Sequence, residues 1–228
     1  KYEAFASCTS LEDVVMSKGV KKIGYEAFKG CTSLKSISVP VSVKEIDDHA
    51  FDGCTSLESI VLPKVKKIGH SAFYGCTSLE SVRIVDSATE IFPCAFRECI
   101  SLKSITIPNS VTEIGIHAFS GCTSLESIVI PDSITNLGER VFNNCTSLKY
   151  AVIGNSVDSI GMYAFSNCDS LSSVVIGKNV SYIAPWAFEN YGSLTSITCL
   201  NPTPPTIDNY TFQGVDYSIE VRVPQNSI

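Results

Sequence analysis

Ten cysteines and three histidines carry the most reactive side chains of this 228-residue chain. Thiols at regular spacing can pair as disulfides, bind a metal or serve as small apolar side chains. If repeats stack, equivalent side chains point in parallel and have little freedom to reach the disulfide dihedral angle. We therefore expect a column of buried free thiols, and since no C-x-x-C spacing occurs, no metal and no cofactor. The column would contain Cys8, Cys31, Cys54, Cys76, Cys99, Cys122, Cys145 and Cys168.

Cys94 lies outside that series and is the other candidate for chemistry. It stands before the Ala of its repeat unit, and His117 has the same place one unit later. An exposed Cys and His one unit apart could form an activated thiolate pair. The sequence offers no third orienting residue and no G-x-S-x-G, H-E-x-x-H, P-loop or dinucleotide motif. We therefore expect an incidental thiol and no enzyme, and keep an enzyme that uses a Cys94/His117 pair as an alternative.

The elements that would position these side chains follow from an internal repeat of 22 to 24 residues. In one unit, Ile105 and Ile107 alternate with polar residues, which predicts a short strand with one buried face, and Pro108 ends it. Ala118 and Cys122 lie four residues apart, which predicts a short helical turn on the opposite side. Phenylalanine marks the units at Phe5, Phe28, Phe51, Phe73, Phe96, Phe119, Phe142, Phe165, Phe188 and Phe212.

A unit of this kind cannot bury its apolar side alone, so the units must stack. The motif L-x-x-I-x-I resembles a leucine-rich repeat, and I-G-x-x-A-F-x-x-C-x-S-L-x-S-I-x-I-P resembles the Treponema-type, or BspA-like, leucine-rich repeats. The resemblance implies an α/β repeat fold: a curved solenoid of about ten rungs, with a parallel sheet on the concave face and short helical turns on the convex face.

Residues 1–200 form the predicted array. We expect residues 201–228 to be an atypical C-terminal capping repeat, because the segment Pro202–Pro205 interrupts the period. Since Lys1 falls inside a unit, we also expect the native array to be longer.

Charge and hydropathy restrict the possible partners. The net charge is −6, from 17 basic and 23 acidic residues, which argues against nucleic acid and against an anionic membrane surface. No run approaches the ~18 apolar residues of a membrane helix, so we expect no membrane insertion in this segment.

The BspA-like resemblance also implies a function. Members of that family are mostly surface or secreted proteins of host-associated bacteria and some anaerobic protists, and those of known function are adhesins. The resemblance therefore implies an extracellular or cell-surface location and a non-catalytic module that binds host or neighbouring-cell proteins. A structural spacer within a larger surface protein is the alternative.

The outward face of the predicted sheet is the default binding surface of such a solenoid. Three consecutive units would expose Val129, Val152 and Val175 there. Exposed apolar groups mark contact sites, but β-branched residues favour strands anywhere, so both explanations of the valines stay open. Tyr150 is the sharper indication, because it interrupts a column of serines and aromatic residues anchor interfaces. Charged neighbours complete the candidate protein-binding site: Arg83, Lys103, Glu126 and Lys149.

Overall fold

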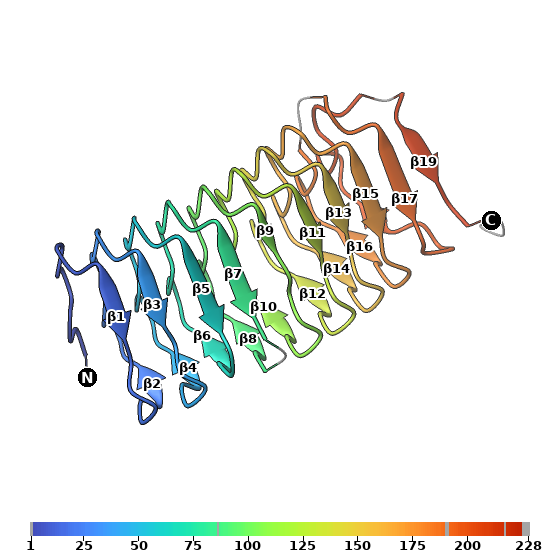
Figure 1. Cartoon of the computed structure of the whole chain (residues 1–228). Coiled ribbons are helices and arrows are strands. Elements are labelled where there is room, and N and C mark those ends of the chain that lie inside the picture. The colour runs from blue at the N-terminus through green and yellow to red at the C-terminus, as the bar shows by residue number, and fades with distance from the viewer. Residues whose placement is uncertain (1, 86, 190–191, 217, 225–228) are drawn as a thin grey trace.

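The computed structural model describes residues 2–85, 87–189, 192–216 and 218–224, which form one curved solenoid of parallel strands (Figure 1). One side of the solenoid, called the sheet face below, carries the longer strands. They are β1 (Asp13–Val15), β3 (Ser36–Ser38), β5 (Ser59–Leu62), β7 (Ser81–Ile84), β9 (Ser104–Ile105), β11 (Ser127–Val129), β13 (Tyr150–Val152), β15 (Ser173–Ile176), β17 (Ser196–Cys199) and β19 (Glu220–Arg222).

A second side carries a row of two-residue strands. They are β2 (Lys22–Ile23), β4 (Glu45–Ile46), β6 (Lys67–Ile68), β8 (Glu90–Ile91), β10 (Glu113–Ile114), β12 (Asn136–Leu137), β14 (Ser159–Ile160), β16 (Tyr182–Ile183) and β18 (Thr206–Ile207). Ten strands in one row and nine in the other make about nine turns, close to the ten rungs expected.

Strand pairing follows the repeat in both rows. Each bridged strand pairs in parallel with the strand one rung away, as in Ile128↔Ala151↔Val174. Alternation sets the facing, because every second residue of a strand points into the core. Ile128, Ala151 and Val174 are accordingly buried, at 1% exposure or less. The last described rung keeps the parallel pairing, since β19 pairs with β17 and β18 with β16, but all residues of β18 and β19 are exposed. Its capping role stays a prediction.

The third side of each rung, called the turn side below, differs from the expectation. Short helical turns were predicted there, but the described residues contain no helix. The cause is that successive backbone amides alternate between a local acceptor and the next rung. Ala118 N donates to Gly115 O within its own rung (3.2 Å), whereas Phe119 N donates to Val141 O of the next rung (2.9 Å). His117 also has φ 57°, a left-handed conformation that interrupts a right-handed helix. Tandem turns therefore replace the helix.

Two columns of side chains fill the core behind the turn side. The phenylalanine rings stack face to face from Phe5 to Phe212, with centroids 5.1 to 5.5 Å apart. Beside them, each thiol from Cys31 to Cys168 donates a hydrogen bond of 3.0 to 3.3 Å to the Phe carbonyl of the preceding rung. The thiols of the column are buried from Cys31 to Cys168, as predicted, whereas Cys8 is exposed. A thiol suits this column because it is small, apolar and a weak donor.

Removal of one ring from the stack should open a cavity. We expect Phe119→Ala to lower the free energy of unfolding by ~3–5 kcal/mol. Ile116→Ala, an exposed position in the same rung, should change it by about 0.5 kcal/mol or less. Urea denaturation followed by circular dichroism measures both variants. A loss below about 1 kcal/mol for Phe119→Ala would contradict the stacked core.

The thiol column predicts a steep alkaline limit of stability. Burial raises the pKa of the Cys54 thiol to about 12, and it raises the pKa of Cys76, Cys99 and Cys145 well above the ordinary range. In the unfolded chain a thiol ionises near pH ~8.5. Above that pH the unfolded state binds fewer protons than the folded state, so the free energy of unfolding falls with pH. The fall is about 1.4 kcal/mol per pH unit for each buried thiol, up to its folded pKa.

Urea titrations between about pH 7 and pH 10 test this limit. Burial also raises the pKa of Cys122. In Cys122→Ala the free energy of unfolding should therefore fall less steeply with pH, by the contribution of one thiol. Leu125→Ala, a buried control without an ionisable group, should shift the whole curve and leave the slope unchanged. Equal slopes for the two variants would show that the column does not carry the pH dependence.

Candidate functional site

The predicted valine row lies in register on the sheet face. Val129 in β11 pairs with Val152 in β13, and Val152 pairs with Val175 in β15. The side chain of Val129 is 57% exposed, whereas Val152 and Val175 are half-buried. The three side chains thus form a continuous apolar strip across three adjacent strands.

Tyr150 lies two residues before Val152 in β13, on the same face of the strand. Its register neighbours are Ser127 in β11 and Ser173 in β15. Because these neighbours are small, the phenol ring protrudes and is 41% exposed. The ring and the valine strip together form the apolar part of the candidate site.

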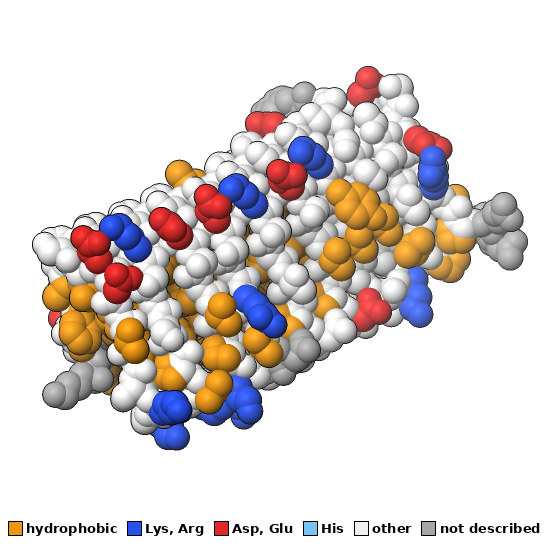
Figure 2. All heavy atoms as spheres, in the orientation of Figure 1, with side chains coloured by type: hydrophobic (Ala, Val, Ile, Leu, Met, Phe, Trp, Pro, Cys, Tyr) orange, Lys and Arg blue, Asp and Glu red, His pale blue; other side chains and the backbone are white. Residues whose placement is uncertain are grey.

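The charged candidates are arranged differently. Lys149 Nζ pairs with Glu126 Oε2 (3.3 Å), and Lys103 pairs with Glu80 (2.9 Å). Figure 2 shows a row of mostly alternating red and blue side chains, called the alternating row below, along the upper edge of the sheet face. These pairs are exposed and therefore contribute at most about 1 kcal/mol each. Arg83 is exposed in β7, in register with Val61, so β9 and β11 separate it from Tyr150.

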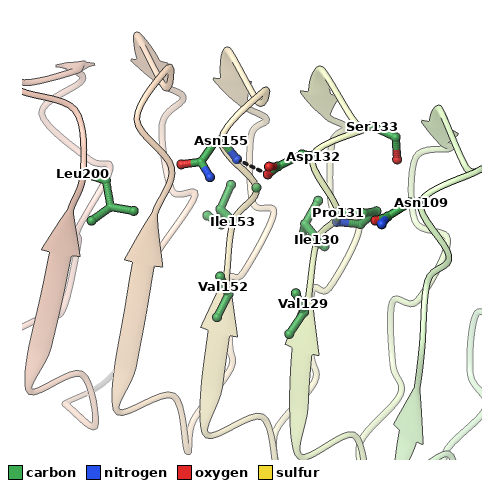
Figure 3. A pocket seen from close by; sticks show the side chains of 11 residues that line it. Asn109, Val129, Ile130, Pro131, Asp132, Ser133, Val152, Ile153, Asn155 and Leu200 are labelled. Carbon is green, nitrogen blue, oxygen red and sulfur yellow. Dashed lines mark hydrogen bonds between the residues drawn. The ribbon is translucent and has the colours of Figure 1, made fainter.

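A hollow of about 420 Å³, called the notch below, adjoins the valine strip. Val129 and Val152 contribute to its lining on adjacent strands, and Pro131 and Leu200 lie on opposite sides of it (Figure 3). On its rim, Asp132 Oδ1 accepts a hydrogen bond from the backbone amide of Asn155 (2.6 Å). The notch can therefore take an apolar group while its rim offers polar partners.

Glycine allows neighbouring rungs to approach closely beside the notch. Proline ends the strands at Pro108 and Pro131, but Gly154 and Gly177 take the same place in the next two units. A Cβ on Gly154 would lie 2.7 Å from the carbonyl oxygens of Ile130 and Pro131, and one on Gly177 would lie 2.2 Å from Gly154 O. The rungs approach too closely for a side chain. Sequence reasoning missed the notch, although the change from Pro to Gly was a visible signal.

The Cys94/His117 pair gains no support from the geometry. Both residues lie on the turn side with left-handed backbones, at φ 58° and 57°. Burial, together with the nearby Arg97 and Arg140, lowers the pKa of His117, so its ring is neutral at pH 7. Its Nδ1 is buried and has no hydrogen-bond partner among the described residues. The described part of the chain also holds no group of three His, Cys, Asp or Glu residues placed to bind a metal.

Parallel rungs, stacked phenylalanines and an open sheet face define a leucine-rich-repeat solenoid. The chain belongs to the BspA-type leucine rich repeat family, whose model matches residues 1–115 and 89–219 with six copies. This family match indicates no enzymatic family. No curated protein matches the chain.

Solved structures of bacterial repeat proteins are similar to this chain. A leucine-rich repeat protein of T. pallidum is 33% identical, with a TM-score of 0.51 over 75% of this chain and 69% of that one. A leucine-rich repeat protein of Bacteroides ovatus is 26% identical, with a TM-score of 0.50 over 98% and 80%. A leucine-rich cell surface protein of Faecalibacterium prausnitzii shares the fold at 23% identity, with a TM-score of 0.53 over 97% and 75%. Within the described residues, no helix is long and apolar enough to span a bilayer.

A side chain added at Gly154 tests whether the rungs approach closely beside the notch. We expect Gly154→Ala to lower the free energy of unfolding by roughly 1–3 kcal/mol, because the added Cβ meets two backbone carbonyls. Gly19→Ala is the matched control: a Cβ there meets nothing within 4 Å, so stability should stay equal or rise by up to ~1 kcal/mol. Thermal and urea unfolding compare the two. Equal effects would mean that Gly154 is not held by the neighbouring rungs.

Proposed function

We propose that this chain is a non-catalytic module that binds a partner protein through its sheet face. The contact is centred on Tyr150 and the strip Val129–Val152–Val175, and the adjoining notch takes an apolar side chain of the partner. The observation that carries the proposal is the combination of an exposed aromatic ring and an apolar strip on three adjacent strands with a hollow beside them.

Physical reasoning supports a protein as the occupant. Apolar groups held on a rigid face lose little conformational freedom on binding, and aromatic residues are frequent anchors of interfaces. Protein interfaces also usually have an apolar centre and a polar rim, as this surface does. The surface is broad, open and continuous along the strands, so it suits an extended segment of another protein.

The proposal includes the setting in which the module works. We place it outside the cell, at a bacterial surface, where it adheres to host or neighbouring-cell proteins. Family membership supports this location, and the structurally similar protein of F. prausnitzii is a cell surface protein. Charged residues of the alternating row, such as Lys103, Glu126 and Lys149, would then border the contact and set its salt dependence.

A binding screen tests the proposal. The purified chain is titrated against immobilised extracellular-matrix and serum proteins, and the double variant Tyr150→Ala/Val152→Ser is compared with the unmodified chain. Loss of an aromatic anchor and its apolar neighbour should weaken a saturable interaction by about tenfold or more.

The matched control is Val61→Ser, an exposed valine (48%) in β5 outside the candidate site. It should bind as the unmodified chain does. If the unmodified chain, the double variant and the Val61→Ser control bind with equal affinity, the site does not include Tyr150. Absence of binding to any protein of the panel would favour the spacer function instead.

A further inference from the structure

Three lysines form a like-charged row at the N-terminal end of the solenoid. Lys21, Lys44 and Lys66 occupy the same place in consecutive rungs, directly before the short strands β2, β4 and β6. Lys44 N donates to Lys21 O (2.8 Å), and Lys66 N donates to Lys44 O (2.7 Å). Neighbouring backbones of a sheet lie ~4.8 Å apart, so the three side chains start one rung from each other. These residues are called the lysine row below.

The row differs from the column beside it. There, opposite charges alternate over four rungs, as in Lys22–Glu45 (3.3 Å) and Lys67–Glu90 (3.3 Å), and only Glu113 follows Glu90 with the same sign. Like charges in direct register destabilise a sheet. A local feature that lowers stability and is not offset by better packing points to a function.

Nothing acidic in the described part of the chain neutralises the row. The Nζ of Lys44 donates to a backbone carbonyl, that of Val41 (3.1 Å), and Lys21 and Lys66 are exposed without an ion pair among the described residues. Lys18 and Lys64 are exposed on the same inter-strand loops. Figure 2 shows the result as blue side chains without red ones along the lower edge of the N-terminal half. This edge is therefore positive, although the net charge of the chain is −6.

We propose that the lysine row binds an acidic polysaccharide, whose sulfate or carboxylate groups follow the three ammonium groups along the solenoid axis. A sugar unit is about as long as one rung is high, so successive anionic units meet successive lysines. Lysine presents a flexible point charge, which suits sulfate groups at variable positions. The surface is a different one from the proposed protein-binding strip on β11, β13 and β15.

Shape and charge favour a linear polymer over a broad anionic surface. A membrane or a folded acidic protein would also face the carboxylates that give the chain its negative net charge, and these would repel it. A single polymer strand touches the narrow positive edge alone. Counterion release from such a polymer makes the interaction weaken with salt.

The test measures binding of the chain to heparin, a sulfated polysaccharide, by isothermal titration at several salt concentrations. The variant is Lys21→Gln/Lys44→Gln/Lys66→Gln. The matched control is Lys29→Gln/Lys35→Gln/Lys178→Gln, which changes the net charge by the same amount at three lysines outside both proposed surfaces. The row variant should lose roughly fivefold in affinity per lysine, about a hundredfold in total, with a shallower salt dependence. The control should stay near the affinity of the unmodified chain.

Equal losses in the two triple variants, or no binding of heparin by the unmodified chain, would overturn the proposal. Vesicles containing phosphatidylserine and soluble polyglutamate serve as competing anions, and binding of either as tight as that of heparin would overturn the choice of a polysaccharide. Thermal unfolding checks the fold of the row variant. Since a repulsion is removed, its melting temperature should equal or exceed that of the unmodified chain.

Discussion

Hydrogen bonding from each rung to the next is the constraint on which this structure depends. It brings equivalent residues of consecutive units into contact, so each position of the repeat becomes a column of neighbouring side chains. A residue must then be compatible with its own equivalents above and below. Flat rings satisfy this requirement by stacking at 5.1 to 5.5 Å, and thiols satisfy it by donating to the preceding carbonyl column. The same amides also prevent a helix on the turn side, since half of them bond to the next rung.

This constraint explains which surface positions are free to serve a partner. Charged columns tolerate the stack when signs alternate, as in Glu80–Lys103 and Glu126–Lys149. Small residues such as serine neither favour nor oppose the stacking of rungs. Tyr150, which lies between two serines, therefore departs from its column. Lys21, Lys44 and Lys66 are a departure of another kind, because their repulsion brings no gain in packing. Both departures lie on the surface, where the core does not dictate the residue type.

The sequence predicts the parts of this fold that depend on one unit at a time. Alternation around Ile105 predicts the strand, and the spacing of phenylalanine predicts the stack. The helical turn around Ala118 was wrong because its spacing describes a single unit, whereas the amide of Phe119 bonds to a neighbouring unit. The notch escaped prediction for a related reason. Leu200 and Pro131 lie three units apart in the chain, and only stacking places them on opposite sides of Gly154.

The arrangement of the two proposed surfaces follows from nearest-neighbour energetics. In a solenoid each rung contacts only the rungs beside it, so its stability is close to a sum of local terms. The lysine row occupies the rungs of β2, β4 and β6, and the apolar strip occupies those of β11, β13 and β15. Intervening rungs separate them, so a substitution at one surface leaves the packing of the other unchanged. One continuous core can therefore support two contacts, one that depends on charge and one that depends on apolar burial. Substitutions can change either contact without affecting the other.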